Sequence, residues 1–214
     1  MKSAEQDVWY GSISDRVTKK KFRPGDIISM QGEVSGFVGY ILSGTAKAVS
    51  FSERGDATWV GYFKADDFFG HTSLLTKSHS QFEISAENEV EAIIISVDVM
   101  HELMVQKDGL SISLANDLAA RLEHMTSRLI EAFTLSAKGR VCAELSRLSK
   151  VIGVSPENLI IRPSPVFVEL AERVNSTRET VSRTVSELQK KGIVSRESGA
   201  LIIKKPEVLK AAIQ

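Results

Sequence analysis

The chain has 214 residues, of which 43% are hydrophobic and 25% charged, with 27 basic and 27 acidic side chains. This length allows one or two ordinary hydrophobic cores, and two small domains are the expected count. No segment approaches the roughly 18 apolar residues of a membrane span, so we expect a cytoplasmic protein without a membrane partner. The one cysteine, Cys142, excludes an intrachain disulfide and a metal site built from several thiolates of one chain. We expect it to be a buried, inert thiol.

Short β-rich runs alternate with glycine-containing turns in the N-terminal half. Strands so closely spaced are typical of a small antiparallel barrel or roll. Between them, Phe68 to Leu75 predicts a strand end that leads into a short helical turn, whose backbone N–H groups are suited to receive a phosphate. The expected strands are Asp26–Met30, Phe37–Leu42, Ala46–Phe51, Thr58–Phe63, Phe82–Ala86 and Val90–Val97.

The hydrophobic period changes from two to about three and a half after Val99, which predicts a helix from about Ser111 to Ser136. Such a helix would be about 39 Å long, which is more than a small domain needs. A two-stranded dimer helix is therefore favoured over a long helix packed on its own domain. Gly139 is expected to end the helical pattern, with a hinge between Ser136 and Gly139. Apolar or small residues recur in steps of four and three at Leu118, Leu122, Met125, Leu129, Ala132 and Ser136.

The charges divide unevenly along the chain. From Arg140 onward, 13 basic residues accompany 8 acidic ones, whereas the first 139 residues contain 14 basic and 19 acidic ones. The C-terminal part is therefore basic and the N-terminal part acidic. This division indicates that a polyanion would bind the C-terminal part.

The C-terminal third carries the signals of two short helices that cross at a tight turn. Small, turn-forming and apolar residues follow one another at offsets that let two helices approach closely, which predicts a helix-turn-helix. An ordinary helical hairpin with surface ion pairs is the alternative. In chain order, the signals are a Ser164 cap with Pro165 at the first helical position, a helix over Val166–Val174, a left-handed turn at Asn175, a cap at Ser176 or Thr177, and a second helix through Leu188.

The second helix presents side chains suited to reading DNA. An arginine can donate two hydrogen bonds to guanine O6 and N7, a glutamate can accept one from cytosine N4, and hydroxyl groups suit phosphate oxygens. Gly192–Ile203 then predicts two strands joined at Ser198-Gly199, which form a wing. The expected DNA-binding residues are Thr177, Arg178, Glu179, Ser182 and Arg183.

The order and spacing of these elements resemble the Crp/Fnr family of bacterial transcription regulators, which includes the cyclic AMP receptor protein, over nearly the whole chain. The resemblance implies an α+β fold. A cyclic-nucleotide-binding-type β-roll would form the effector domain over residues 1–110, a dimerisation helix and hinge would cover 111–138, and a winged helix-turn-helix would cover 139–214. The motifs that carry it are Arg23-Pro24-Gly25-Asp26, Gln31-Gly32-Glu33, Tyr40–Gly44, Asp67–Gly70, Ala120-Arg121-Leu122, Gly139-Arg140-Val141 and Arg178–Arg183.

The resemblance also implies partners and residue roles. A homodimer would bind double-stranded DNA at a palindromic TGTGA-like site and would contact RNA polymerase. Arg178 and Arg183 would contact guanines, and Glu179 would contact a cytosine. An enzyme is not expected, because the sequence contains no Gly-rich phosphate loop and no recognisable catalytic motif.

The resemblance fails in the effector pocket. Relatives that bind cyclic AMP carry a Gly-Glu pair at the phosphate-binding turn and an Arg-Ser or Arg-Thr pair further along. Here the first pair is Gly70-His71, followed by Thr72, and the second is Ser80-Gln81, or Gln81-Phe82 if the alignment gap moves. Neither placement supplies an arginine. Arg121 matches the family, whereas the two hydroxyl residues that touch adenine correspond to Met125-Thr126, so that one hydroxyl is lost.

We therefore expect a degenerate pocket that does not bind cyclic AMP tightly, and no cofactor or metal. Two hypotheses stay open: another small-molecule effector controls DNA binding, or the protein binds DNA without an effector. The missing cysteine cluster excludes an iron–sulfur sensor. A haem-based sensor is a further alternative, although no pair has a helical ligand spacing among His71, His79, His101 and His124.

Overall fold

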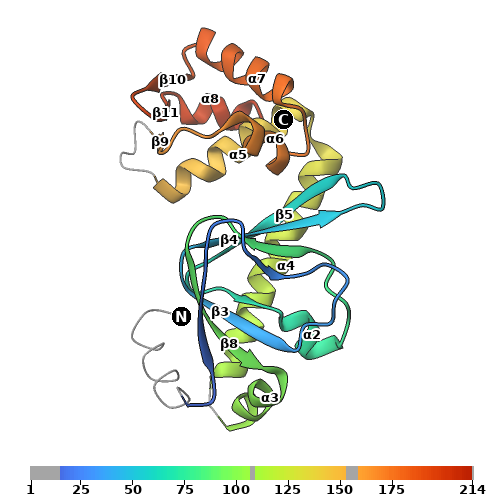
Figure 1. Ribbon diagram of the computed structural model, residues 1–214. Coiled ribbons are helices and arrows are strands. Elements are labelled where there is room, and N and C mark those ends of the chain that lie inside the picture. The colour runs from blue at the N-terminus through green and yellow to red at the C-terminus, as the bar shows by residue number, and fades with distance from the viewer. Residues whose placement is uncertain (1–14, 107–108, 153–158, 214) are drawn as a thin grey trace. The chain divides into compact units, whose positions relative to one another are not determined.

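The computed structural model describes residues 15–106, 109–152 and 159–213. Contacts among them divide the chain into two units, with the boundary between His124 and Met125, within helix α4 (Leu110–Thr134). Each unit buries its own apolar clusters. Figure 1 shows the helices and strands of both units, coloured along the chain. The domain bounds at residues 110 and 138 remain a prediction. In the described ranges, no helix is long and apolar enough to cross a membrane.

Two four-stranded antiparallel sheets make up most of the N-terminal unit, in the orders β1-β8-β3-β6 and β2-β7-β4-β5. Both sheets contribute to one buried apolar cluster, which includes Ile41, Phe63 and Ile84. Residues alternate between buried and more exposed along β4, as expected for a strand with one face in a core. The predicted roll is confirmed. Its strands are β1 (Thr18–Phe22), β2 (Ile27–Ser29), β3 (Phe37–Ser43), β4 (Thr45–Phe51), β5 (Ala57–Lys64), β6 (Phe68–Phe69), β7 (Glu83–Ala86) and β8 (Val90–Ser96).

The helices of the N-terminal unit are α2 (His71–Thr76), α3 (Val97–Gln106) and the first part of α4. The predicted strand end and helical turn are confirmed, since β6 leads through Gly70 into α2. Gly70 has a φ of 78°, and a Cβ there would lie 2.6 Å from the Phe37 carbonyl oxygen, so that only glycine fits this turn. Leu114 of α4 packs with Leu103 of α3 in a second apolar cluster.

The C-terminal unit combines helices with a three-stranded sheet of order β10-β11-β9. Leu145 and Val181 lie in its core, and the hairpin turn at Ser198-Gly199 joins β10 to β11. The α+β class, the winged helix-turn-helix and the wing hairpin are therefore confirmed, whereas α5, β9 and α8 were not expected. The elements are α5 (Ala137–Ile152), β9 (Leu159–Ile161), α6 (Phe167–Arg173), α7 (Arg178–Lys190), β10 (Val194–Glu197), β11 (Ala200–Ile203) and α8 (Pro206–Ala211).

The prediction that Gly139 ends the long helix is wrong. The helix stops at Thr134, and Gly139 lies in the first turn of α5. Ser136 caps that turn, because its hydroxyl accepts a hydrogen bond from the Gly139 N–H at 3.1 Å. A Cβ at position 139 would lie 2.8 Å from the Ile213 carbonyl oxygen. The absence of a side chain at Gly139 therefore allows the C-terminal segment to pack closely against α5.

The prediction that Ser164 and Pro165 start the first helix of the helix-turn-helix is also wrong. α6 begins at Phe167, and Val166 occupies the cap position without a side-chain hydrogen bond. The Ser164 N–H instead donates to the Gly199 carbonyl oxygen at 2.7 Å. Ser164 therefore lies outside the helix, and its backbone is bonded to the wing turn.

Candidate nucleic-acid interface and effector site

The turn between α6 and α7 has the expected geometry. Asn175 adopts the left-handed conformation, with a φ of 46°. The Thr177 hydroxyl accepts a hydrogen bond from the Thr180 N–H at 3.2 Å, so that Thr177 and not Ser176 caps α7. The turn thus fixes where the N-terminal end of α7 begins.

Arg140 holds this turn, a role that the sequence indicated only through the Gly139-Arg140-Val141 motif. Its Nε donates to the Val174 carbonyl oxygen at 2.8 Å, and one terminal nitrogen donates to the Asn175 carbonyl oxygen at 3.0 Å. The other terminal nitrogen donates to the carbonyl oxygen of Leu135, at the end of α4, at 3.1 Å. A planar guanidinium can make these three bonds at once, which a lysine cannot.

The predicted DNA-binding residues lie together on the N-terminal half of α7 and its cap. Thr177, Arg178, Glu179 and Arg183 are exposed and Ser182 is half-buried, while the opposite face of the helix packs into the core. Bonds to its own backbone N–H and to Thr177, and the Arg178 charge, lower the pKa of Glu179, so its carboxylate is ionised near neutral pH. In the described ranges, neither arginine forms an ion pair, so both guanidinium groups are available to a ligand.

The C-terminal half of α7 is tied to α5. Glu187 accepts from the ammonium groups of Lys138 in α5 at 2.7 Å and of Lys191 at 2.9 Å. These bonds lower the pKa of Glu187 to about 2. In the wing, the Arg196 guanidinium lies 4.4 Å from the centre of the Phe167 ring in α6, a cation–π contact. Sequence reasoning identified neither contact, because both join segments far apart in the chain.

α4 presents an uncovered apolar stripe in the C-terminal unit, which we define as Met125, Leu129 and Phe133. Their exposed fractions are 50%, 58% and 82%. The spacing of four residues places Leu129 and Phe133 on one face of the helix. Phe133 was not identified from the sequence, where Ala132 was taken as the seam position. In the N-terminal unit, Leu122 is exposed as well.

His71 occupies the predicted effector site at the start of α2 and is buried. Burial lowers the pKa of its imidazole and the nearby Arg121 charge lowers it further, whereas Asp117 and a backbone hydrogen bond at Phe68 act in the opposite direction. The imidazole is therefore neutral near neutral pH and supplies no charge for a phosphate. Among the described residues, its Nδ1 atom has no hydrogen-bond partner.

Arg121 lies close to His71, as expected, but two carboxylates already compensate its charge. Its Nε donates to the Asp117 Oδ2 at 2.8 Å, and a terminal nitrogen lies 3.5 Å from the Asp67 Oδ1. The guanidinium also stacks 4.2 Å from the centre of the Phe63 ring. Burial raises the pKa of Asp67, against the lowering effect of a Lys64 backbone bond and of Arg121. Sequence reasoning missed both carboxylates, although the four-residue spacing of Asp117 and Arg121 was visible.

Ser80 and Gln81 form hydrogen bonds with backbone carbonyl oxygens of the N-terminal unit. The Ser80 N–H donates to the Glu33 carbonyl oxygen at 2.7 Å, and its hydroxyl donates to the Phe82 carbonyl oxygen at 2.6 Å. Gln81 is exposed, and its amide donates to the His79 carbonyl oxygen at 3.3 Å. Neither alignment of this segment brings a cation to the site.

Three other residues predicted for the effector pocket are exposed. Thr72 is exposed on α2, and Met125 and Thr126 are exposed in the C-terminal unit. The structure thus brings His71 and Arg121 together within the N-terminal unit. In the described ranges, no group of three or more His, Cys, Asp or Glu side chains could hold a metal ion. The haem alternative stays a prediction, with His79, His101 and His124 exposed on separate elements.

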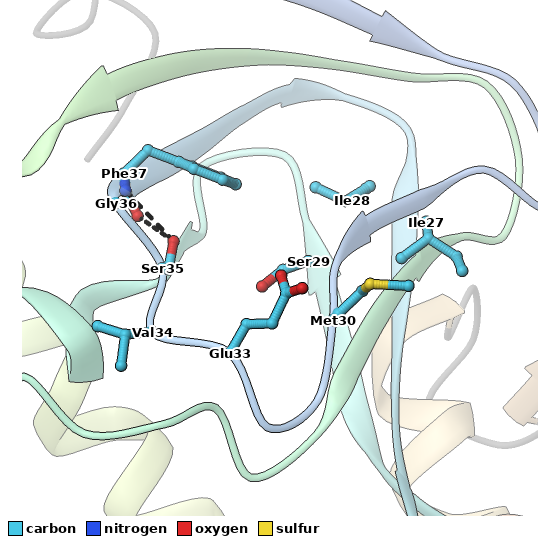
Figure 2. A pocket seen from close by; sticks show the side chains of 9 residues that line it. All are labelled: Ile27, Ile28, Ser29, Met30, Glu33, Val34, Ser35, Gly36 and Phe37. Atoms are coloured by element: carbon cyan, nitrogen blue, oxygen red, sulfur yellow. Dashed lines mark hydrogen bonds between the residues drawn. The ribbon is translucent and has the colours of Figure 1, made fainter.

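A hollow of about 300 Å³ opens between β2 and the segment that leads into β3 (Figure 2). Its apolar lining includes Ile27, Met30 and Val34, each about half exposed. Among the described residues that line it, Glu33 alone is charged, and Figure 2 shows its side chain extended toward Ser29. A hollow whose charged group is a carboxylate suits a neutral or cationic ligand better than an anion.

The Cys142 thiol is fully buried in α5, as predicted. Burial raises its pKa from 9.0 to about 11.

We expect the native protein to resist alkylation of Cys142 by iodoacetamide at about pH 8, while the urea-unfolded chain reacts. Above pH 9.0 the unfolded thiol ionises but the folded one stays protonated, so stability should fall as the pH rises toward 11. Urea unfolding of wild type and Cys142→Ala between pH 9.0 and 11 measures this change in stability. Fast alkylation of the native protein would contradict the burial of the thiol.

Two family descriptions match separate parts of the chain: "Cyclic nucleotide-binding domain" over residues 19–107 and "Crp-like helix-turn-helix domain" over residues 139–212. The chain is 23% identical over 209 residues to the "Anaerobic regulatory protein" of Bacillus subtilis (strain 168), covering 96% of this chain and 87% of the relative. It is 22% identical over 199 residues to the "CRP-like cAMP-activated global transcriptional regulator" of Mycobacterium tuberculosis (strain H37Rv), covering 92% and 89%. A solved structure of a transcriptional regulator of the CRP/FNR family from Thermus thermophilus has a TM-score of 0.71 and 22% identity, covering 92% of this chain and 98% of that one.

Proposed function

Because the chain belongs to the Crp/Fnr family of transcription regulators, we propose that it binds DNA as a homodimer, at a palindromic site with TGTGA-like half-sites. One observation carries the proposal. Arg178 and Arg183 project from the exposed N-terminal half of α7 without an ion pair in the described ranges, beside the ionised Glu179. Unpaired arginines on a helix of a helix-turn-helix are suited to the major groove.

Each side chain of this face has a proposed role. Arg178 and Arg183 donate paired hydrogen bonds to guanine O6 and N7, and Glu179 accepts from cytosine N4. Thr177 and Ser182 contact phosphate oxygens, which position the helix without reading sequence. RNA polymerase remains a partner implied by the resemblance.

The α4 stripe supports the homodimer. Large apolar side chains as exposed as Leu129 and Phe133, four residues apart on one face of the helix, are stabilised when a second copy of the helix covers them. A two-fold axis between the paired helices would present two recognition helices to successive major grooves about 34 Å apart. This arrangement accounts for a palindromic site.

We further propose that cyclic AMP does not control this protein. The Arg121 charge is already matched by Asp117 and Asp67, and His71 is neutral, so that neither of these two described residues offers a cyclic phosphate an uncompensated positive charge. The described residues that line the hollow beside β2 include no basic side chain either. Either a neutral or cationic effector binds the N-terminal unit, or DNA binding needs no effector.

A fluorescence anisotropy titration tests both parts. Effector-free protein should bind a duplex with two inverted TGTGA-like half-sites, and saturating cyclic AMP or cyclic GMP should change the affinity by less than about twofold. The Mycobacterium tuberculosis relative on its own site is the positive control. Weak binding to every palindrome would contradict the DNA-reading role. A large enhancement by cyclic AMP would contradict the account of the pocket alone.

A further inference from the structure

Glu144 of α5 is a carboxylate in the interior of the C-terminal unit, with 2% of its side chain exposed. Arg128 lies 2.9 Å from its Oε2 and Arg173 lies 3.5 Å from its Oε1, and Arg147 pairs with the same carboxylate. A buried charge is tolerated only when it is paired and hydrogen-bonded, and this one has three cationic partners. Such a site is costly to break, because removing a partner leaves a charge without compensation.

The ion pairs join three helices that are separate in the sequence. Arg128 and Glu131 belong to α4, Glu144 and Arg147 to α5, and Arg173 to the end of α6; we call these five residues the Glu144 cluster. Arg147 pairs with Glu131 in addition to Glu144. The Arg128 guanidinium also donates to the Arg173 carbonyl oxygen at 2.9 Å. The first helix of the helix-turn-helix is therefore bonded directly to α4.

A second set of bonds lies close by in the same unit. Arg140 links the Leu135 carbonyl oxygen, just after α4, to the carbonyl oxygens of Val174 and Asn175 in the turn before α7. The last part of α4 is thus bonded to the end of α6 through Arg128 and to the turn through Arg140. Charge-assisted bonds with fixed donor geometry resist small rotations better than apolar contacts alone.

The same part of α4 carries the apolar stripe on another face. Arg128 turns toward α5, whereas its neighbour Leu129 is 58% exposed. One short helical segment therefore bears both the proposed dimer contact and the bonds that hold the DNA-reading helices.

We propose that the Glu144 cluster makes the last part of α4, together with α5, α6 and α7, a single rigid reader, so that the pairing of the α4 stripe sets the spacing of half-sites that the dimer accepts. The inference rests on the proposed homodimer that reads two half-sites. Glu144 and Arg128 are positioning residues, since they act through the helices to which they are bonded. The sequence predicted a hinge at Ser136 to Gly139. The Glu144 cluster and the Arg140 bonds connect the residues before this segment to those after it.

The dependence of DNA affinity on half-site spacing does not change when a variant only lowers the overall stability of the fold. Each inserted base pair shifts one half-site by about 3.4 Å and rotates it by about 34° relative to the other. A rigid pair of recognition helices cannot follow this change, whereas a loosened pair can.

Arg128→Gln is the main variant. It removes the Arg128 bonds from α4 to Glu144 of α5 and to Arg173 of α6, while the Arg147–Glu131 pair remains. Glu144 keeps Arg147 and Arg173, and the stripe and α7 stay intact. Duplexes with one or two base pairs added to or removed from the spacer are titrated with full-length protein. We expect wild type to lose about tenfold or more per base pair of misspacing, and Arg128→Gln to lose less than about threefold, with weaker binding at the preferred spacing.

Lys210→Gln is the matched control, since it removes one positive charge from the exposed Lys210–Glu207 pair of the same unit. It should keep the wild-type spacing profile. Arg147→Gln, which leaves Glu144 bonded to Arg128 and Arg173, serves as a second cluster variant if Arg128→Gln does not fold. Thermal unfolding and ultracentrifugation establish that each variant is folded and dimeric.

The outcomes separate the inference from the function on which it rests. A wild-type protein that is monomeric, or indifferent to spacing, would overturn the proposed homodimeric reader. A sharp wild-type optimum that folded, dimeric cluster variants retain would overturn the inference alone. So would an equal loss of affinity at every spacing, because that pattern indicates stabilisation without positioning.

Discussion

A Leu129→Glu/Phe133→Glu variant should be monomeric and should lose more than about a thousandfold in affinity for a palindromic duplex. Both side chains are exposed in the single chain and would be buried in the proposed dimer. Burying one large apolar side chain stabilises an interface by about 1.5–3 kcal/mol, and a dimer buries each of them twice. The glutamates would instead face each other across the two-fold axis, where like charges repel. Analytical ultracentrifugation and anisotropy titration measure the two effects.

Ser127→Glu is the matched control for this variant. Ser127 is exposed on the same helix but lies outside the spacing of the stripe, so its variant should stay dimeric and bind as wild type does. Circular dichroism of all three proteins checks that the helices persist. If the double variant remained a dimer with wild-type DNA affinity, the stripe would not be the dimer interface.

Arg178→Ala and Arg183→Ala should each lose about 1–3 kcal/mol of binding free energy per half-site and relax the preference at one base pair. A homodimer carries two copies of each residue, so the loss on a palindrome should be about twice as large. The cause is the loss of a bidentate guanine contact, which no neighbouring side chain of the helix can replace. Titration against duplexes with single symmetric base changes locates the affected position.

Lys190→Ala supplies the control for these arginines, because Lys190 is an exposed cation at the opposite end of the same helix. Its loss should weaken binding equally on all duplexes, if at all, since a phosphate contact carries no sequence information. Arginine variants that kept wild-type discrimination at every base pair would show that another face of the unit reads the DNA.

Much of the fold could be predicted from the sequence because its signals are local. Asn175 suits a left-handed turn wherever it occurs, Ser198-Gly199 suits a hairpin, and alternation along segments such as Ala46–Phe51 predicts a strand with one buried face. The proposed DNA-reading face belongs to this class, since one helix brings Arg178, Glu179 and Arg183 together through their spacing alone.

Predictions failed where a distant partner outweighed a local preference. Ser164 had the composition of a helix cap, but its N–H bonds to Gly199 in the wing. Gly139 was expected to end a helix, but it lies where the Ile213 carbonyl oxygen approaches too closely for a side chain. β1 was missed because its lysines show no alternation, and only its pairing with β8 makes it a strand. Charged side chains such as lysine are common on edge strands, because they discourage pairing with another chain.

The sequence predicts that the cyclic AMP-binding residues are replaced, since the resemblance places His71 and Ser80-Gln81 where relatives that bind cyclic AMP carry an acid and an arginine. The tertiary structure alone decided which charges remain available. It brings Asp67 to Arg121, and Arg128 and Arg173 to Glu144, from elements that are separate in the sequence. Whether two charges compensate each other depends on their separation and burial, and the fold sets both quantities. The sequence therefore determined which chemical groups the chain carries, while the tertiary structure determined which of them are already satisfied within it.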